Sequence, residues 1–231
     1  MHWDKLKILK IVDGERVSQM DTVIREAEIV MRVDERLYRR FYCLAERIEE
    51  LALGYLFDEG VALPGDIDVA AEGHNVSVTR KCGAKTHKPA AIDSELRLTY
   101  DDVLALVDEM NDNCPMFSST GGTHVVGIVC GDERFFVEDI SRHCAIDKAI
   151  GFAVKNGFDL SQCILVTSCR QTVSAMSKAV NAGIPIVVTI AAPTTMAVTE
   201  AINYGVTLVG FARGRKFNVY SHPHRIVTGS R

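Results

Sequence analysis

The chain has 231 residues, 47% hydrophobic and 24% charged, with a formal net charge of −4 and a pI near 6.0. This composition is ordinary for a soluble globular protein of one large or two small domains, and the acidic balance argues against general affinity for nucleic acid. No apolar run approaches the ~20 residues of a membrane span, so we expect neither a nucleic-acid nor a membrane partner.

The first half of the chain is rich in predicted strands. The alternating run 5–12 predicts a half-buried strand that ends at the turn Asp13-Gly14. Two hairpins are expected, one pairing 28–33 with 37–44 and one pairing 67–71 with 75–79. A helix over 45–58 lies between them and ends at Gly60. Thr99 is expected to cap a second helix that runs to about Asn111, and residues 112–119 are expected to form a loop.

The second half alternates strands and helices. A hairpin over 123–130 and 134–137 is followed by expected helices over 143–156, 171–181 and 193–204 and by expected strands over 163–167, 184–190 and 206–211. Short apolar strands separated by helices predict a parallel or mixed sheet with both faces covered. We therefore expect a strand-rich N-terminal part, residues 1–113, and an α/β domain, residues 114–231.

The cysteines are odd in number and form no CxxC pair: Cys43, Cys82, Cys114, Cys130, Cys144, Cys163 and Cys169. Free thiols in a reducing compartment explain this pattern better than a disulfide framework does. The first residues, Met1-His2-Trp3-Asp4, do not resemble a signal peptide. A cytoplasmic protein is therefore expected.

One cysteine stands in a basic segment. No acidic residue occurs between Glu72 and Asp93, and Cys82 is surrounded there by Arg80, Lys81, Lys85 and Lys88. Neighbouring cations favour the thiolate and lower a cysteine's pKa, which makes it a better nucleophile near neutral pH. Cys82 is therefore a candidate nucleophile. A solvated basic loop with an incidental cysteine is the alternative.

Ligands of α/β folds usually bind at the carboxyl ends of the parallel strands. Three expected loops fall there, at 168–170, 191–195 and 212–216. In the last of them Arg213, Arg215 and Lys216 flank Gly214, a pattern that suits phosphate contacts at close backbone approach. A basic surface turn is the alternative.

Smaller groups of residues stay ambiguous. His143 and Asp147 are four residues apart on one expected helix, so they form either an acid–base pair or a structural pair. His124 is either a core histidine or a site residue. The pair Gly121-Gly122 allows a ligand to approach the backbone, although a hairpin that leads into a capped helix explains it equally. The sequence contains no P-loop, GxSxG or HExxH motif and no HxE/PCxxC pair, so no catalytic zinc is expected.

Several ordered segments resemble the FdhD/NarQ family of formate dehydrogenase accessory sulfurtransferases. The resemblance runs from about Glu50 onward and is strongest from Phe117 to Arg225. It is carried by ELALGYL (50–56), SSTGGTH (118–124), EDISRHCAIDKAIG (138–151), SCR (168–170), KAVNAGIPI (178–186), APTTMAV (192–198) and GFARGRKFNVY (210–220).

The resemblance implies a fold and a role. The fold is a cytidine-deaminase-like three-layer α/β/α core without zinc, joined to a smaller strand-rich N-terminal part. The role is that of a homodimeric sulfur carrier, which receives persulfide sulfur from a cysteine desulfurase. It passes this sulfur to the molybdenum bis(molybdopterin guanine dinucleotide) cofactor, its cargo, for insertion into formate dehydrogenase. GDP-like nucleotides are expected to mimic the cargo.

The resemblance also assigns the site residues. Cys82 is the expected persulfide site, and no metal ligands are expected. The cofactor-binding positions are Phe211, Ala212, Arg213, Gly214, Arg215 and Lys216, together with Thr120, Gly121, Gly122, His143 and Arg170.

The sequence departs from the family pattern at four positions. Lys85 stands where the family has the second cysteine of a CxxC pair, Ser141 replaces Gly, Cys144 replaces Asn and Cys169 replaces Gly. Two other functions therefore stay open. One is a molybdenum-cofactor-binding chaperone of the same family without sulfur transfer. The other is a hydrolase or deaminase relative that uses His143 and Asp147.

Overall fold

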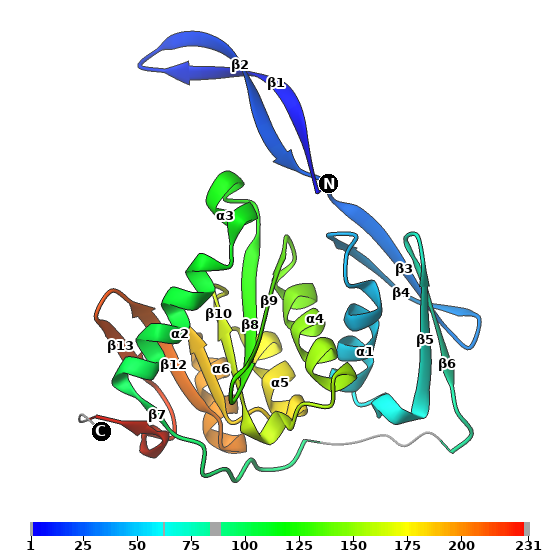
Figure 1. Ribbon diagram of the computed structural model, residues 1–231, viewed down its shortest axis with the longest axis vertical. Coiled ribbons are helices and arrows are strands. Elements are labelled where there is room, and N and C mark those ends of the chain that lie inside the picture. The colour runs from blue at the N-terminus through cyan, green and yellow to red at the C-terminus, as the bar shows by residue number, and fades with distance from the viewer. Residues whose placement is uncertain (1, 62, 84–88, 229–231) are drawn as a thin grey trace.

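The computed structural model describes residues 2–61, 63–83 and 89–228 (Figure 1). At its centre is a six-stranded sheet in the order β13-β12-β11-β10-β8-β9. Strands β10, β11 and β12 are parallel, and the β8–β9 and β12–β13 hairpins add antiparallel strands at the two sides. The strands are β8 (His124–Cys130), β9 (Glu133–Asp139), β10 (Cys163–Thr167), β11 (Ile186–Thr189), β12 (Thr207–Arg213) and β13 (Lys216–Val219). The predicted mixed sheet is confirmed.

Helices cover both faces of this sheet. One face packs against α4 (Arg142–Lys155), α5 (Val173–Ala182) and α6 (Thr195–Tyr204), and the other against α2 (Tyr100–Asp112). Alternate residues of each strand enter the two cores, as the two-residue period of a strand requires: Leu165 belongs to the first core and Val166 to the second. The result is a three-layer α/β/α arrangement.

A second sheet, in the order β4-β3-β6-β5, lies beside the first. Its strands are β3 (Ala27–Val33), β4 (Arg36–Cys43), β5 (Ile67–Glu72) and β6 (Asn75–Arg80). Helix α1 (Ile48–Asp58) packs between this sheet and α4 (Figure 1), which explains why most of its surface is buried. Both predicted hairpins of this half are confirmed.

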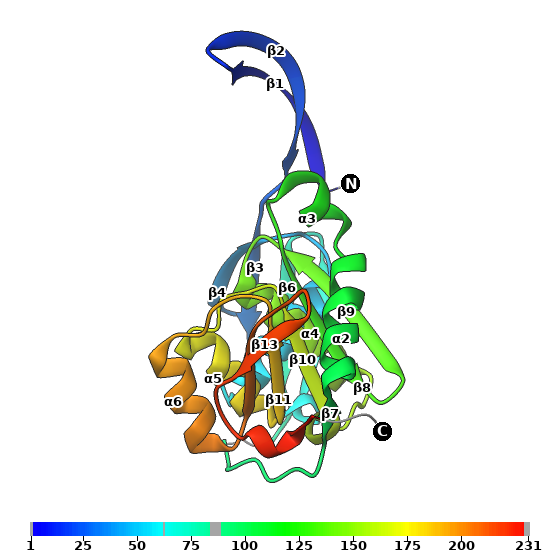
Figure 2. The ribbon, with the colours of Figure 1, turned by 90° about the vertical axis from the view of Figure 1, so that its left-hand side faces the viewer.

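The first two strands, β1 (Trp3–Val12) and β2 (Glu15–Ile24), pair only with each other and extend away from the body (Figures 1 and 2). We call this hairpin the N-terminal arm. At its base the guanidinium of Arg25 pairs with Asp4, and His2 lies 3.0 Å from Glu46. The half-buried strand expected over 5–12 is wrong in its burial, because this hairpin has no core to pack against. Most of the large apolar side chains of the arm are exposed: Trp3, Leu6, Leu9, Ile11, Val12, Val17, Met20 and Val23.

The loop expected over 112–119 is wrong, because α3 (Pro115–Thr120) forms there. Pro115 occupies the start of the helix, where its missing N–H is not needed. The Glu138 carboxylate, which is buried, accepts the Met116 N–H at 2.9 Å and the Phe117 N–H at 2.7 Å. A carboxylate from a strand that is distant in the sequence thus caps this helix, and no residue near the helix in the sequence predicts this cap.

Short elements complete the chain: β7 (Leu98–Thr99) pairs with β14 (Ile226–Val227), and single 3-10 turns lie at Pro64–Asp66, Leu160–Gln162 and Pro223–Arg225. Helix α2 precedes the expected boundary at residue 113 but packs on the six-stranded sheet. The division into two domains stays a prediction. Within the described part of the chain, no helix combines the length and hydropathy needed to cross a membrane.

Candidate functional site

The carboxyl ends of β10, β11 and β12 meet at one edge of the central sheet, as predicted, and hydrogen bonds join the loops that follow them. The Gln171 N–H donates to Ala192 O at 3.2 Å, and the Thr194 N–H donates to Gln171 O at 2.9 Å. The Phe211 N–H donates to Ala191 O at 3.1 Å. We call this joined surface the carboxyl edge.

Buried threonine hydroxyls fix these loops. Thr167 Oγ1 accepts the Cys169 N–H at 2.9 Å, while Thr189 Oγ1 donates to Cys169 O at 2.7 Å and accepts the Ala191 N–H at 3.0 Å. Cys169 itself is fully buried, and burial raises the pKa of its thiol to about 11. Cys169 is therefore a packed, protonated thiol that supports the loop carrying the exposed Arg170.

The start of β8 also reaches the carboxyl edge. The Ser168 N–H donates to Val125 O at 2.9 Å, and Ser168 Oγ accepts the Val125 N–H at 2.9 Å. Thr120, Gly121 and Gly122 lie just before β8, with Gly121 ending α3 at φ 66°. A Cβ at Gly122 would lie 3.1 Å from Ile24 Cγ1, so this glycine makes its close approach to the base of the N-terminal arm.

Positive charge gathers around His124, the first residue of β8. Burial lowers the pKa of His124, and the charges of Arg142 and Arg170 lower it further. Two buried polar atoms of the described residues have no hydrogen-bond partner, Arg142 Nε and Gln171 Oε1. Gln171 belongs to the carboxyl edge, and Arg142 lies close enough to influence the Cys169 thiol there. Such groups mark places where a bound molecule or water completes the hydrogen bonding.

Arg142 and Gln171 are not among the site residues predicted from the sequence. Arg142 was visible only as part of the segment EDISRHCAIDKAIG, and Gln171 only as the residue after SCR. Their unpartnered atoms arise from packing between loops that are distant in the chain.

Phe211 is the most unusual residue of the predicted cofactor-binding segment. Its φ of 53° lies in the left-handed region, which residues other than glycine seldom adopt. A register shift between Gly210 and Arg213 accompanies it, and the Arg213 guanidinium lies 5.5 Å from the centre of the Phe211 ring. Strained backbone of this kind concentrates at ligand-binding positions.

The loop expected at 212–216 is wrong in its extent. Arg213 ends β12 and Lys216 begins β13, so only Gly214 and Arg215 form the turn of a hairpin. Phe211, Arg213, Lys216 and Asn218 line a cavity of about 320 Å³. Arg215 does not line it, and its carbonyl accepts the Tyr100 hydroxyl at 2.6 Å.

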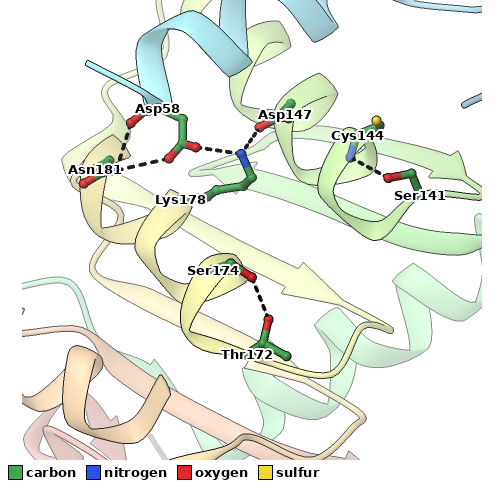
Figure 3. Close-up of polar contacts among 8 residues, drawn as sticks. All are labelled: Asp58, Ser141, Cys144, Asp147, Thr172, Ser174, Lys178 and Asn181. Carbon is green, nitrogen blue, oxygen red and sulfur yellow. Dashed lines mark hydrogen bonds and ion pairs between the residues drawn. The ribbon is translucent and has the colours of Figure 1, made fainter. Parts of the chain in front are cut away.

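A second cavity, of about 680 Å³, lies between β4, the end of α1, the start of α4 and α5. We call it the helix-layer cavity. Lys178 Nζ lies 2.6 Å from Asp58 Oδ2 and 2.7 Å from Asp147 Oδ1 (Figure 3). The lining includes Arg39, Arg40, Tyr55, His143, Cys144, Asp147, Ser174 and Lys178.

The structure places His143 in the helix-layer cavity, apart from the Phe211 and Arg213 pocket, with which it shares no lining residue. Burial lowers the pKa of His143 to about 4, with contributions from Arg142 and Lys178, so the ring is neutral at pH 7. Complete burial raises the pKa of Asp147 to about 7, while both carboxylate neighbours raise the pKa of Lys178. Asp147 is bound to Lys178, which favours the structural interpretation of the His143 and Asp147 spacing.

Cys82 is the only exposed thiol among the seven cysteines, all of which lie in the described part of the chain. The surroundings of Cys82 are less cationic than the sequence predicts, because carboxylates from the β3–β4 turn and from β5 reach the two described cations. Arg80 Nε donates to Asp34 Oδ2 at 2.7 Å, and Lys81 Nζ lies 3.2 Å from Asp68 Oδ1. Lys85 and Lys88 lie outside the described residues.

The chain is similar to known proteins over nearly its whole length. The sequence profile of the FdhD/NarQ family matches residues 68–227. The sulfur carrier protein FdhD of Methanothermobacter thermautotrophicus is 33% identical over 237 residues, covering 94% of this chain and 96% of that protein. The sulfur carrier protein FdhD of Sulfolobus acidocaldarius is 31% identical over 247 residues, covering 96% of this chain and 98% of that protein.

A solved structure shares the whole fold. A crystal structure from Desulfotalea psychrophila, described as a candidate formate dehydrogenase accessory protein, superposes with a TM-score of 0.89 at 22% identity. The superposition covers 98% of this chain and 100% of that chain. Because the profile spans most of this sequence and the Methanothermobacter relative exceeds 30% identity over nearly its full length, the chain belongs to the FdhD/NarQ family.

Proposed function

We propose that this protein carries sulfur during the maturation of formate dehydrogenase. Cys82 accepts persulfide sulfur from a cysteine desulfurase and passes it to the molybdenum bis(molybdopterin guanine dinucleotide) cofactor, which is the cargo. The observation that carries the proposal is the exposure of Cys82 alone among the seven cysteines. The names of the curated relatives, sulfur carrier protein FdhD, support the same role.

The loading step needs an exposed thiol because the desulfurase persulfide is on another protein. The Cys82 thiolate attacks the terminal sulfur of that persulfide, and a new S–S bond forms on Cys82. The old S–S bond breaks, and its electron pair leaves with the desulfurase thiolate. Sulfur moves without net oxidation, so no further reactant is required.

The carboxyl edge is the proposed place of the cargo. Arg213 and Lys216 line the 320 Å³ cavity and supply positive charge for the phosphates of the guanine dinucleotide arms. Arg170 and the unpartnered atoms of Arg142 and Gln171 extend this polar surface toward β8. Thr120, Gly121 and Gly122 are also proposed as site residues, because their segment lies just before β8.

We assign the six-stranded unit to the cytidine-deaminase-like folds. An antiparallel hairpin, β8–β9, precedes three parallel strands, and helices cover both faces. The catalytic zinc motif of that fold is absent from the sequence. A cytoplasmic location is also proposed, because all seven cysteines are free thiols.

The N-terminal arm supports self-association into a homodimer. It exposes apolar side chains on both faces of a two-stranded ribbon, which is marginally stable in isolation. A surface of this kind needs a partner that is always present in the same amount as the protein itself. A second copy of the chain is such a partner. In size-exclusion chromatography with light scattering, Leu9→Ser with Ile11→Ser should yield monomers, whereas Met196→Ser with Ile202→Ser on α6 should not. A monomeric wild-type protein contradicts the dimer.

The function is tested by intact-mass spectrometry after incubation with a cysteine desulfurase and cysteine. The wild type should gain sulfur, Cys82→Ala should not, and Cys130→Ala, which removes a half-buried thiol, should gain sulfur as the wild type does. A wild type that binds GDP but gains no sulfur overturns the carrier role. That result instead supports the cofactor-binding chaperone, the alternative favoured by Lys85 at the position of a second cysteine.

A further inference from the structure

Two cysteines that are far apart in the sequence meet beside the helix-layer cavity. Cys43 is the last residue of β4, and Cys144 lies in the first turn of α4. Their sulfur atoms and a carboxylate oxygen of Asp139 all lie within 4.8 Å of one another, and all three residues are buried. Cys144 also lines the helix-layer cavity, one turn of α4 before Asp147 (Figure 3). A small molecule in this cavity therefore reaches Cys144 first.

The surroundings give the two thiols different roles. A hydrogen bond with Cys43 lowers the pKa of Cys144, and a hydrogen bond with Ser141 adds to the effect. The same contact with Cys144, together with burial, raises the pKa of Cys43. The N-terminus of α4, a helix of 14 residues, also favours negative charge on Cys144. Cys144 is therefore the nucleophile of the pair, and Cys43 holds the proton.

Asp139 is already neutralised by a buried cation. Lys148 Nζ lies 2.6 Å from Asp139 Oδ2 and also donates to Leu44 O at 2.9 Å. The N–H groups of Ser141 and Leu44 occupy further positions on the same carboxylate, at 2.8 and 3.3 Å. A metal ion bound between the thiols and Asp139 would have to displace this ammonium group. Chemistry of the two thiols alone leaves the ion pair intact.

We propose that Cys43 and Cys144 form a dithiol that takes sulfane sulfur from a persulfide, RS–SH, in the helix-layer cavity and releases it as hydrogen sulfide. The Cys144 thiolate attacks the terminal sulfur of RS–SH and becomes Cys144–S–SH, while RS⁻ leaves with the electron pair of the broken bond. Cys43 then attacks the inner sulfur of Cys144–S–SH. The departing HS⁻ takes the proton of Cys43 and leaves as H₂S.

Electrons balance in this sequence. The two protein thiols lose two electrons in forming the Cys43–Cys144 disulfide, and the sulfane sulfur gains two in becoming sulfide. A small-molecule thiol, two equivalents per turnover, reduces the disulfide and is itself oxidised to a disulfide. The cavity, at about 680 Å³, has room for a small persulfide, and Cys144 lies on its wall.

The Cys43 and Cys144 pair acts independently of Cys82 and of the loading role proposed for it. It adds a reducing function to a chain whose exposed loop carries a single cysteine. A carrier with one thiol can hold sulfane sulfur, but conversion to sulfide requires a second thiol or an external reductant.

The test uses the full-length chain with Cys82→Ala, so that the exposed thiol does not contribute, and glutathione persulfide as the probe. After one addition of the probe, released sulfide is measured against a protein-free control, and peptide mapping locates sulfur and disulfide. We expect sulfide release above the control and a Cys43–Cys144 disulfide. Adding Cys163→Ser, which removes another buried thiol, should leave both unchanged.

Variants of the pair separate the two steps. Adding Cys144→Ser should abolish both the sulfur adduct and the excess sulfide, with Cys144→Asn as a second variant of similar polarity where the serine variant fails to fold. Adding Cys43→Ser should leave sulfur on Cys144 but no disulfide. Absence of sulfur from Cys144 in the folded Cys43→Ser variant, or sulfide release unaffected by both replacements, overturns the proposal. Because these measurements omit Cys82, their failure leaves the desulfurase test of Cys82 unaffected.

Discussion

Gly54 of α1 and Gly151 of α4 face each other where the two helices cross. A Cβ at Gly54 would lie 1.9 Å from Asp147 O, and a Cβ at Gly151 would lie 1.9 Å from Glu50 O. The backbones therefore touch directly, and only glycine fits at either position. This contact joins the helix of the four-stranded sheet to the α/β layer and brings Asp58 of α1 to the same lysine as Asp147.

Replacement of either glycine should separate the two helices. We expect Gly54→Ala and Gly151→Ala each to lower the free energy of unfolding by about 1–3 kcal/mol or more, since the added methyl group meets backbone that cannot move aside locally. Urea denaturation followed by circular dichroism measures this. Gly65→Ala is the matched control, because a Cβ there has no atom within 4 Å. Equal stability of all three variants would show that the helices can shift without cost.

Guanine nucleotide binding should distinguish neighbouring basic residues. Arg213 and Lys216 line the 320 Å³ cavity, whereas Arg215 lies in the adjoining turn. We expect Arg213→Ala with Lys216→Ala to weaken GDP binding at low salt at least tenfold, about 1.4 kcal/mol. Arg215→Ala should change it far less. Isothermal titration calorimetry gives both affinities, and an equal loss in the two variants would mean that charge alone, rather than the cavity, attracts the nucleotide.

Replacement of Phe211 should affect the stability of the fold and the binding of GDP in different ways. Its φ of 53° costs on the order of 1–3 kcal/mol for a non-glycine residue. Phe211→Gly removes this strain together with the ring, so we expect the melting temperature to hold or rise while GDP binding weakens. Differential scanning calorimetry and titration with GDP test the two halves. A large fall in melting temperature would identify the ring as a packing residue.

The Lys178 ion pairs should be essential to the fold. Lys178→Met leaves Asp58 and Asp147 buried without their cation, so we expect a loss of about 3–5 kcal/mol in the free energy of unfolding. Lys155→Met is the matched control. Lys155 pairs with Glu49 and Glu50 on the same helix layer but is 41% exposed, and its pairs should contribute at most about 1 kcal/mol. Similar losses in both variants would refute the special role of Lys178.

His143 should make the protein less stable in mild acid. Its pKa is about 4 in the folded chain, below the ordinary histidine value of 6.5. Between these values the unfolded chain binds more protons at this residue, so its stabilising contribution is complete above pH 6.5 and is lost as the pH falls toward 4. His143→Gln should therefore make the slope of the unfolding free energy against pH less positive in this window, whereas Asp147, whose pKa burial raises to about 7, contributes a slope of the opposite sign in both proteins. An NMR titration of the His143 ring that gives a pKa near 6.5 would contradict the expectation.

Local patterns predicted much of the fold. Thr99 was identified as a helix cap, and in the structure it exchanges hydrogen bonds with Asp102 at 2.8 and 3.1 Å. The hairpin that pairs 28–33 with 37–44 is also confirmed, because hairpin signals lie within a few residues of one another. Features that depend on near neighbours in the chain are therefore readable from the sequence.

Features built by distant residues were not readable. In the sequence, the segment around Cys82 is cationic. In the structure, Asp34 and Asp68 of the four-stranded sheet approach its arginine and lysine. The Asp58 and Lys178 pair joins α1 to α5, and Cys43 meets Cys144 across two layers. No spacing rule connects such partners. The predicted site residues stay predictions, and their distribution over two separate cavities follows only from the tertiary structure.

The state of the N-terminal arm can be followed by the protein's own fluorescence. Its only tryptophan, Trp3, lies on β1 near the base of the arm and is 38% exposed. Intrinsic fluorescence therefore reads the arm rather than the α/β core: burial of the indole by a partner should shift its emission to shorter wavelength. Unfolding followed by this fluorescence and by backbone circular dichroism need not coincide, and a gap between the two curves would measure how independently the arm detaches.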